Sequence, residues 1–367
     1  ADVIVGAPYY DNGQGDEGMA LVYLGGAAGL SAAAAWTAES DQAAALFGTS
    51  VGTAGDVNGD GYGDVIVGAS FYANGQIYEG GAWVYLGSAS GLGAAAAWAA
   101  ESDQAAAQFG GSVGTAGDVN GDGYADVIVG ASFYDNGQDG EGVAFVYPGS
   151  AAGLAAAAAW TLEIDQAGAY FGWSVGTAGD VNGDGYADVI VGADNYDNGQ
   201  GNEGGAWVYL GSAAGLSATA AWMAEGNQAS AWFGHSVGTA GDVNGDGYAD
   251  VIVGARWYSN GQASEGAAFV YLGSAAGLGA AAAWTGEGNQ EGAYFGHSTG
   301  TAGDVNGDGY ADVIVGAPNY DSSLGAAFVY LGGAAGLAAT AWTAEGNQAG
   351  ASFGGSVGTA GDVNGDG

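Results

Sequence analysis

The amino-acid sequence predicts an all-β protein, a β-propeller built from six four-stranded blades. Three observations predict this fold class: an acidic motif recurs six times, each copy lies among short apolar runs bounded by turn residues, and the N-terminal residues repeat the strand that follows the motif. Because the repeats account for the whole chain, we expect a single domain over residues 1–367.

The repeated motif is Asp-Val-Asn-Gly-Asp-Gly, and its copies divide the chain evenly. Successive copies are 62 residues apart, except that the last follows after 58, mainly because the loop at 320–325 is shorter. Propeller blades usually repeat every ~40–50 residues, so a period of about 62 leaves room for long loops. The motif begins at Asp56, Asp118, Asp180, Asp242, Asp304 and Asp362.

Each repeat contains four short strand patterns. In one copy these are a Phe-Gly run at 109–113, an Asp-Val-Ile-Val-Gly-Ala run at 126–131, an aromatic run at 144–147 and an Ala-rich run ending at Trp160. Turn residues separate the runs, as expected for a meander of sequence-adjacent strands. Helix is disfavoured in spite of the alanines, because glycine interrupts each Ala-rich stretch within about two turns.

The N-terminal residues predict how the array closes. Residues 1–7, Ala-Asp-Val-Ile-Val-Gly-Ala, match the strand that follows the acidic motif in the other repeats. We expect this strand to join the last repeat, which closes the propeller and covers exposed strand edges. A fragment of a seven-bladed or longer array is the alternative.

Charge and hydropathy exclude two classes of partner. The chain has 40 Asp and Glu residues against one Lys or Arg, Arg256, and its formal net charge is −39. Binding to nucleic acid requires a cationic surface, so a nucleic-acid partner is not expected. No apolar run reaches the ~18 residues that a membrane-spanning helix needs, so membrane insertion is not expected either.

The acidic loop has the spacing of a calcium site. Counting from its first Asp, side-chain oxygens fall at positions 1, 3, 5 and 9, a backbone carbonyl is available at position 7, and Gly at position 6 permits a sharp turn. This is the logic of an EF-hand loop, and Ca²⁺ takes six to eight oxygen ligands, water included. Asn-Gly and Asp-Gly alone would indicate only turns, but a turn does not require Asp at positions 1 and 9. The predicted ligands are Asp56, Asn58, Asp60, Tyr62, Asp64, Asp118, Asn120, Asp122, Tyr124, Asp126, Asp180, Asn182, Asp184, Tyr186, Asp188, Asp242, Asn244, Asp246, Tyr248, Asp250, Asp304, Asn306, Asp308, Tyr310 and Asp312, with a sixth set of Asp362, Asn364, Asp366 and Asp2.

The sixth set is divided between the two ends of the chain, so we expect it to bind most weakly. Up to six Ca²⁺ ions, about one per repeat, are predicted, and their role is structural because clustered carboxylates repel one another without metal. Calcium sites of this kind favour an extracellular or cell-surface location, where free calcium is high.

These motifs resemble the FG-GAP repeats of integrin α-subunit propellers and their bacterial relatives. The resemblance rests on the acidic loop, on a Phe-Gly pair in each repeat, and on Gly-Ala-Pro at 6–8 and 316–318. It covers the whole chain and implies a calcium-stabilised adhesion or recognition module, of a kind often found within a larger surface protein. Two features depart from the family: Pro is replaced at Ser70, Ser132, Asp194 and Arg256, and six units are present where integrin propellers have seven blades.

A partner surface is predicted on the face opposite the calcium loops. Successive hairpin turns alternate between the two faces of a propeller, so the Tyr-x-Asn-Gly-Gln loops lie opposite the acidic ones. That face carries the variable residues Tyr78, Trp232, Arg256 and Trp257, which we expect to contact a protein or glycan. His235 and His297 are interpreted as strand residues. The tryptophans that recur once in each repeat are interpreted as packing residues: Trp36, Trp98, Trp160, Trp222, Trp284 and Trp342.

The sequence therefore predicts an extracellular protein-interaction, adhesion or scaffold module and not an enzyme. No Ser or Cys nucleophile arrangement accompanies the histidines, and the calcium motif already accounts for the paired carboxylates that a glycosidase would need. A lectin-like sugar-binding propeller and a purely structural subunit of a surface assembly or filament are the alternatives.

Overall fold

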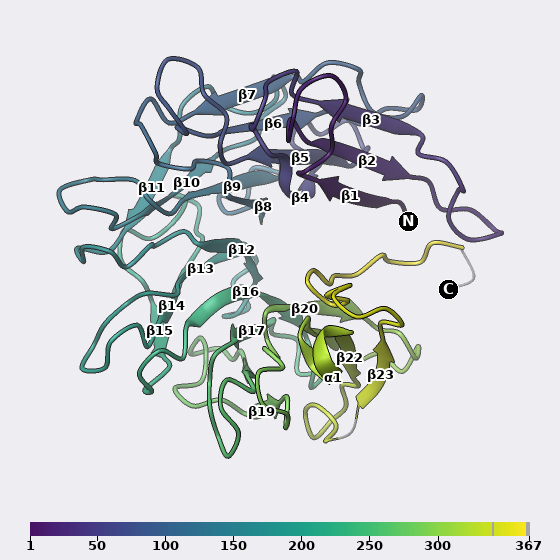
Figure 1. Ribbon diagram of the computed structural model, residues 1–367. Coiled ribbons are helices and arrows are strands. Elements are labelled where there is room, and N and C mark those ends of the chain that lie inside the picture. Colours follow the sequence, from purple (N-terminus) through teal and green to yellow (C-terminus); the bar gives the residue numbers. More distant parts are fainter. Residues whose placement is uncertain (340, 365–367) are drawn as a thin grey trace. The chain divides into compact units, whose positions relative to one another are not determined.

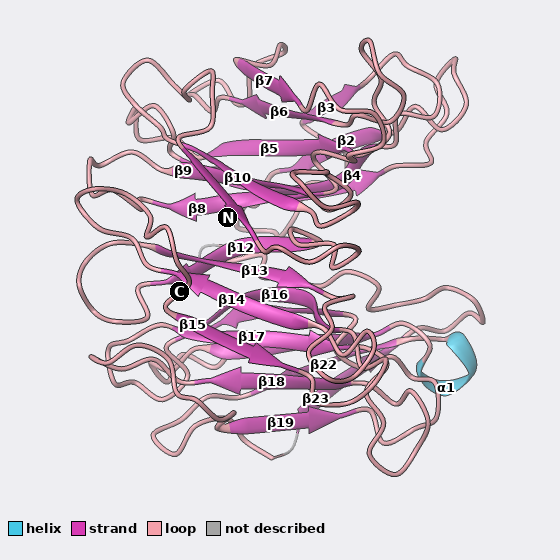
Figure 2. Ribbon diagram, turned by 90° about the vertical axis from the view of Figure 1, so that its left-hand side faces the viewer, coloured by secondary structure: helices cyan, strands magenta, loops and turns pink. Residues whose placement is uncertain are grey.

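The protein consists of six antiparallel sheets, which follow one another along the chain. A computed structural model describes residues 1–339 and 341–364. Five sheets have four strands and the first has three, and each strand pairs with its neighbour in sequence (Figure 2). The predicted fold class, an all-β propeller of six blades, is confirmed, although the first blade has three strands among the described residues instead of the predicted four. Among the described residues, helix is confined to one short turn, α1 (Tyr320–Ser323).

The chain divides into two compact units, each with three sheets. The first unit comprises residues 1–175 and 360–367, and the second residues 176–359. In Figure 1 the sheets of the first unit run from purple to blue-green along the chain. Its strands are β1 (Val3–Ala7), β2 (Met19–Tyr23) and β3 (Trp36–Glu39), then β4 (Phe47–Gly55), β5 (Asp64–Ala69), β6 (Gly81–Tyr85) and β7 (Trp98–Glu101), then β8 (Ser112–Gly117), β9 (Asp126–Ala131), β10 (Val143–Tyr147) and β11 (Trp160–Glu163).

The second unit repeats the same arrangement. The first strand of its first sheet starts two residues before the boundary between the units. Its strands are β12 (Ser174–Gly179), β13 (Asp188–Ala193), β14 (Gly205–Tyr209) and β15 (Trp222–Glu225), then β16 (Phe233–Gly241), β17 (Asp250–Ala255), β18 (Ala267–Tyr271) and β19 (Trp284–Glu287), then β20 (Ser298–Gly303), β21 (Asp312–Ala317), β22 (Ala326–Tyr330) and β23 (Ala341–Glu345).

The second strand of each four-stranded sheet is an inner strand and is largely buried. In β9 the β-branched residues Val127, Ile128 and Val129 are fully buried, as expected for a strand covered on both faces. Gly130 in the same strand allows close approach of the next repeat. A Cβ atom at Gly130 would lie 2.0 Å from the carbonyl oxygen of Gly172, so no larger residue fits there.

The Phe-Gly pairs connect consecutive sheets within each unit. Phe109 is 1% exposed, its N–H donates to the carbonyl of Glu79, and its ring packs against Phe145 and Tyr147. Phe47, Phe171, Phe233 and Phe295 are equally buried. This phenylalanine therefore fills the apolar layer between one sheet and the next, which explains its repetition.

Among the residues that the structure describes, none forms a first strand in the sheet of the N-terminal strand. β1 pairs with β2 on one side only, and residues 346–364, which correspond to a first strand and its acidic loop, form no strand beyond an isolated bridge at Phe353. Closure of the array by the N-terminal strand therefore stays a prediction.

In the part of the chain that the structure describes, no helix is long and apolar enough to cross a membrane.

Candidate functional site: the acidic loops

Five complete acidic loops occupy the same place in five sheets, between the first and the second strand. In the loop at 118–126, Asp118 faces the backbone of its own loop. Its Oδ1 accepts hydrogen bonds from the N–H groups of Gly121 (2.7 Å) and Asp122 (3.1 Å), and its Oδ2 accepts one from Gly123 (2.8 Å). Gly123 has φ +90°, a conformation that favours glycine. The first Asp therefore closes the turn, as the predicted spacing requires.

The next two polar residues lie inside the same turn. Oδ1 of Asn120 accepts a hydrogen bond from the N–H of Asp122 (2.8 Å), and Oδ1 of Asp122 accepts one from Tyr124 (3.1 Å). In the loop at 180–188 the amide of Asn182 also donates to Oδ2 of Asp184 (2.9 Å). Positions 3 and 5 are thus neighbours, with their oxygens on a short stretch of exposed loop.

The ninth residue is buried, unlike the others. Oδ2 of Asp126 accepts a hydrogen bond from the N–H of Val119 (2.9 Å), and Oδ1 accepts one from Gly149 (2.8 Å), which lies in the following hairpin turn. The equivalent carboxylates make the same two bonds and are at most 1% exposed: Asp64, Asp188, Asp250 and Asp312. This residue therefore joins the acidic loop to the rest of its sheet.

The oxygen donors of each loop suit a hard cation, but the carboxylates do not converge on one point as the ligands of a bound metal would. Each loop offers three carboxylates, an amide oxygen and a backbone carbonyl, the ligand types that Ca²⁺ prefers. Among residues 1–339 and 341–364, however, no group of three or more Asp, Glu, His or Cys side chains is arranged to hold a metal ion. The first carboxylate accepts a hydrogen bond from the N–H of Gly123 in its own loop, whereas the ninth accepts one from Gly149 in the following hairpin turn.

The sixth predicted set is only partly within the described residues. Asp366 lies outside them. Oδ1 of Asp2 accepts a hydrogen bond from the N–H of Gly25 (2.9 Å), which corresponds to the bond between Asp126 and Gly149. The N-terminal amino group of Ala1 donates to the carbonyl oxygen of Asp362. The divided site stays a prediction.

Burial changes the titration of the ninth residues. It raises the pKa of Asp126, Asp188 and Asp250 from 3.8 to about 6, although their backbone hydrogen bonds oppose the rise. The first residue behaves differently: burial acts to raise the pKa of Asp56, but hydrogen bonds from Gly61, Gly59 and their neighbours lower it overall. In the loop at 56–64 the pKa of Asp56 is thus lowered, whereas burial raises the pKa of Asp64.

We expect acidification to stabilise the calcium-free protein. A carboxyl whose folded pKa is raised contributes stability that is present at low pH and lost as pH rises through about 6. In the presence of a chelator, the melting temperature should therefore be higher at pH 5 than at pH 7.5, as measured by circular dichroism. Asp188→Asn removes one titrating group and should make the dependence on pH shallower. A melting temperature that falls on acidification under these conditions would contradict the expectation.

Sequence reasoning missed a buried glutamate in the loops that join the second and third strands. Oε1 of Glu141 accepts the N–H of Asn136, and Glu163 accepts a hydrogen bond from the Asn136 side chain. Glu141 is fully buried, and so are its equivalents Glu17, Glu79, Glu203 and Glu265. The recurring Glu-Gly pair was the available signal. These glutamates fix the Tyr-x-Asn-Gly-Gln loops to their sheets.

The predicted partner residues of the second unit form a cluster around the only arginine of the chain. The rings of Trp232 and Trp257 stack at 4.5 Å, and the Arg256 guanidinium lies 4.5 Å from the centre of the Trp232 ring. Nη1 of Arg256 is 3.4 Å from Nδ1 of His297. Burial lowers the pKa of His297 to about 4, so its neutral ring can accept this hydrogen bond. The cluster combines a cation with flat aromatic surfaces.

Asp194 and His235 lie beside this cluster and were not predicted as partners. Nδ1 of His235 is 3.0 Å from Oδ2 of Asp194, and both side chains are buried. Burial raises the pKa of Asp194 and lowers that of His235, which favours the uncharged pair over an ion pair. His235 lies in β16, as expected for a strand residue, whereas His297 was wrongly predicted as one and immediately precedes β20. In the first unit, Tyr78 is 45% exposed and its ring lies 4.9 Å from that of Phe71.

The repeated tryptophans pack between successive repeats. Nε1 of Trp98 donates to the carbonyl of Ala155 (2.9 Å), and its ring meets Tyr147 edge to face. Trp36, Trp222 and Trp284 contact a tyrosine of the next repeat in the same way. Trp342 is the exception, at 64% exposed.

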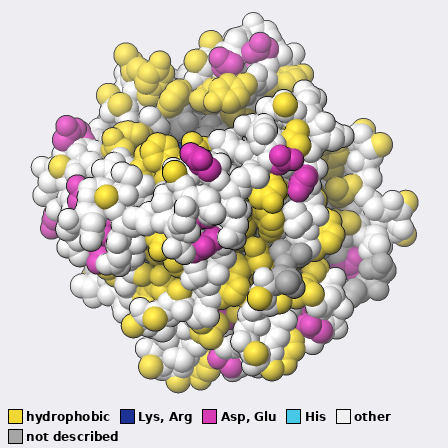
Figure 3. All heavy atoms as spheres, turned by 60° about the horizontal axis from the view of Figure 1, so that its bottom comes forward, with side chains coloured by type: hydrophobic (Ala, Val, Ile, Leu, Met, Phe, Trp, Pro, Cys, Tyr) yellow, Lys and Arg dark blue, Asp and Glu magenta, His cyan; other side chains and the backbone are white. Residues whose placement is uncertain are grey.

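On the face shown in Figure 3, acidic side chains are interspersed with apolar and uncharged ones.

The Phe-Gly pair and the acidic loop occur together in a known repeat family. The model of the FG-GAP repeat matches five segments, which together make up more than half of the chain: 47–85, 109–147, 171–209, 233–271 and 295–330. Each segment runs from the Phe-Gly pair through the acidic loop to the third strand.

The proteins similar to this chain include integrin α subunits. The chain is 38% identical to integrin alpha-7 of Homo sapiens over 154 residues, 40% of this chain and 12% of that protein. It is 37% identical to integrin alpha-V of Gallus gallus over 163 residues (42% and 15%), and 33% identical to integrin alpha-5 of Xenopus laevis over 174 residues (45% and 16%). The matches thus span less than a fifth of these relatives' length.

Proposed function

Because the chain belongs to the FG-GAP repeat family, we propose that it is an extracellular interaction module whose acidic loops bind structural calcium. The observation that carries this proposal is the loop itself. Five copies with the same oxygen donors lie at the same place in five sheets, and each connects two strands of the core. An adhesion or protein-interaction role agrees with the similarity to integrin α subunits.

The proposed calcium ligands are the side chains at loop positions 1, 3, 5 and 9 and the carbonyl at position 7. In the loop at 242–250 these are Asp242, Asn244, Asp246, Asp250 and the backbone of Tyr248. When bound, calcium supplies positive charge that offsets the repulsion between carboxylates. The Kd of a loop for calcium need only lie near the extracellular calcium concentration, since extracellular modules bind calcium with Kd values of roughly 10⁻⁴–10⁻³ M.

The proposed partner surface comprises Trp232, Arg256, Trp257 and, in the first unit, Tyr78. Aromatic residues and arginine contribute most of the binding energy at many interfaces. The guanidinium of Arg256 is one of very few positive charges on a strongly acidic chain, so an acidic protein or a glycan carrying a carboxylate suits it. Catalysis is not part of the proposal, because the carboxylates of the loops are engaged with backbone N–H groups.

The calcium sites are tested by measuring the binding of Ca²⁺. Isothermal titration of the calcium-free chain with Ca²⁺ should show about one ion per complete loop, and Asp242→Ala with Asp246→Ala should remove one ion. No heat of binding, or binding unchanged in the double variant, would contradict the calcium sites.

The class of partner is tested by arrays of glycans and of cell-surface ectodomains, both probed in calcium. An interaction module of the proposed kind binds one or more ectodomains, and Trp257→Ala weakens that signal. Binding to glycans alone would favour the lectin-like alternative. Self-association into sheets or filaments without other binding would favour a structural subunit.

A further inference from the structure

Asparagine followed by glycine is prone to a spontaneous reaction, deamidation, which needs only water. The backbone nitrogen of the glycine attacks the side-chain carbonyl carbon of the asparagine, and the side-chain nitrogen leaves as ammonia together with the N–H proton. Water then opens the succinimide ring, which leaves aspartate or isoaspartate in place of asparagine. Glycine favours the attack because it has no side chain and few backbone restrictions. Asp-Gly forms the same ring with loss of water, and thereby isomerises to isoaspartate.

The chain contains Asn-Gly in two kinds of loop. In the acidic loops the pair is followed at once by Asp-Gly, and in the Tyr-x-Asn-Gly-Gln loops it is followed by Gln. The reacting residues are the same in both kinds of loop, so a difference in their reactivity has to come from the fold. The asparagines concerned are Asn58, Asn120, Asn182, Asn244 and Asn306 in the complete acidic loops, and Asn12, Asn74, Asn136, Asn198 and Asn260 in the others.

In the acidic loop at 118–126 the first aspartate holds both glycine nitrogens that could react. The N–H of Gly121, which follows Asn120, donates to Oδ1 of Asp118 (2.7 Å), and the N–H of Gly123 donates to Oδ2 (2.8 Å). A nitrogen held in this way must break a hydrogen bond to a charged group before it can attack. The same two bonds, at 2.7 and 2.8 Å, occur in the loops at 56–64, 180–188 and 242–250.

The asparagine of the acidic loop is held as well. Oδ1 of Asn120 accepts a hydrogen bond from the N–H of Asp122 (2.8 Å), and Asn120 is half-buried. The equivalent asparagines accept the same bond and are half-buried too: Asn58, Asn182 and Asn244. Both partners of the reaction are therefore fixed by the hydrogen bonds of the loop itself.

The Tyr-x-Asn-Gly-Gln loops leave the glycine nitrogen free. In the part of the chain that the structure describes, no hydrogen bond is made by the N–H of Gly13, Gly75, Gly137, Gly199 or Gly261. A Cβ atom at any of these glycines would meet no other atom within 4 Å, and the asparagines before them are exposed. The attacking nitrogen is therefore neither hydrogen-bonded nor crowded in this kind of loop.

The asparagine of the Tyr-x-Asn-Gly-Gln loop anchors the loop to the last strand of its sheet. Nδ2 of Asn74 donates to Oε1 (2.9 Å) and Oε2 (3.0 Å) of Glu101, at the end of β7. Equivalent bonds join Asn12 to Glu39, Asn198 to Glu225 and Asn260 to Glu287. Deamidation turns the donor into a second carboxylate, which repels the glutamate instead of binding it. Each event thus removes an anchor and adds a negative charge to the loop.

We propose that the Asn-Gly pairs of the Tyr-x-Asn-Gly-Gln loops deamidate spontaneously in the folded chain, and that the first aspartate of the acidic loop protects that loop from the same reaction. Asp118 acts as a positioning residue, because it holds the two glycine nitrogens that would attack Asn120 and Asp122. The reaction consumes water, releases ammonia and requires neither an enzyme nor a metal ion. It is independent of the proposed calcium sites and of the proposed partner surface.

Incubation of the folded chain in mildly alkaline buffer with excess chelator, below its melting temperature, tests the proposal. Chymotrypsin cleaves after aromatic residues and gives each loop a peptide of its own sequence, so mass spectrometry measures each site separately. The Tyr-x-Asn-Gly-Gln loops should deamidate at least about tenfold faster than the acidic loops, which must first break a hydrogen bond to a charged group. In concentrated urea both kinds of loop should react at similar rates. Equal rates in the folded chain, or the same difference in urea, would overturn the proposal.

The variant Asp118→Ala tests the protective role of the first aspartate. It should raise the rates of deamidation at Asn120 and of isomerisation at Asp122 at least about tenfold. The loops at 56–64, 180–188 and 242–250 of the same molecule are internal controls, since unfolding of the variant would accelerate the reaction in all of them. Asp122→Ala is the matched control. Asp122 accepts the N–H of Tyr124 and not that of a glycine, so Asn120 should stay protected in this variant.

A conservative variant, Asp118→Asn, keeps one acceptor oxygen and serves if the alanine variant unfolds. It should give a smaller increase that is confined to the same loop. Deamidation of Asn120 that is unchanged in both variants would overturn the role of Asp118. Protection of the parent chain that appears in calcium but not in chelator would overturn it as well, because the protection would then belong to the ion.

Discussion

Removal of calcium is expected to lower the melting temperature of this protein steeply. Each complete loop places three carboxylates within nine residues, on a chain of formal net charge −39. A site whose ligand stands 100-fold above its Kd contributes roughly 2.7 kcal/mol to stability. Since whole domains are stable by only about 5–15 kcal/mol, several such sites amount to much of the total. Differential scanning calorimetry in millimolar calcium and in excess chelator measures the effect.

The ion can be separated from general screening of charge. Magnesium at the same concentration should restore much less stability than calcium, because it demands stricter octahedral geometry and keeps its own water ligands. Sodium chloride at matched ionic strength should restore little, since it screens charge without entering the loops. Equal melting temperatures in calcium and in chelator would refute a structural role for the ion.

Much of the fold follows from local sequence. Residues 126–131 were expected to form a strand on the basis of β-branched residues between turns, and β9 has those bounds. Phe109 is a buried core residue. Strand β7 begins at Trp98 and β11 at Trp160. Such features are predictable because the propensity and the packing of each repeat agree, and every repeat supplies the evidence again.

Directions of side chains were harder to predict, because they depend on residues distant in sequence. Asp126 was placed in the loop by its spacing from Asp118, yet Gly149, 23 residues further on, holds one of its oxygens. Asp194 and His235 are 41 residues apart and belong to different repeats. A spacing rule within one loop contains no information about such contacts, which arise only when strands from two repeats are placed side by side.

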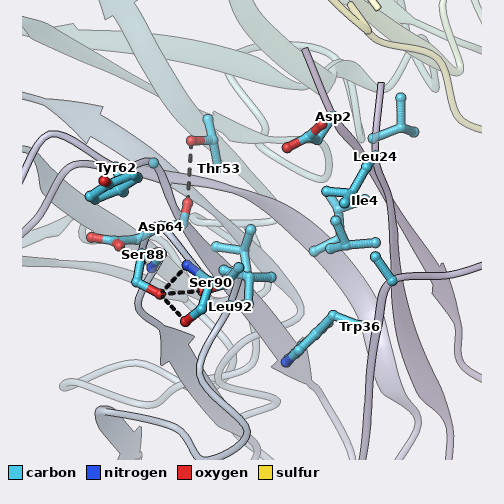
Figure 4. A pocket seen from close by; sticks show the side chains of 17 residues that line it. Asp2, Ile4, Leu24, Trp36, Thr53, Tyr62, Asp64, Ser88, Ser90 and Leu92 are labelled. Carbon is cyan, nitrogen blue, oxygen red and sulfur yellow. Dashed lines mark hydrogen bonds between the residues drawn. The ribbon is translucent and has the colours of Figure 1, made fainter. Parts of the chain in front are cut away.

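The repetition itself also concealed a difference between the repeats. Gly63 stands where the later repeats have Ala125, Ala187, Ala249 and Ala311, and the substitution looks minor in sequence. In the structure Gly63 is one of the residues that line a cavity of about 460 Å³ (Figure 4). No residue in the sequence marks that space, because it is defined by what surrounds it.

Replacement of the buried aspartate at loop position 9 is expected to destabilise the protein even without calcium. Oδ1 and Oδ2 of Asp250 accept hydrogen bonds from Gly273 and Val243 at 2.8 and 2.9 Å, and the side chain is fully buried. Asp250→Ala leaves both N–H groups without an acceptor, at a cost of about 1–3 kcal/mol each. Chemical denaturation in excess chelator at pH 7.5 measures the change in the free energy of unfolding.

Asp246, at position 5 of the same loop, provides the matched control. It is exposed and accepts hydrogen bonds only from the N–H of Tyr248 and the Asn244 side chain of its own loop, both in the exposed turn, so Asp246→Ala should cost less than about 1 kcal/mol in chelator. In calcium both variants should lose the ion of this loop. Asp250→Asn keeps one acceptor oxygen and should fall between Asp250→Ala and the parent chain. Equal costs for Asp250→Ala and Asp246→Ala in chelator would show that position 9 acts only through the metal. A larger cost for Asp250→Ala would show that the same carboxylate also holds the loop to its sheet before any ion binds.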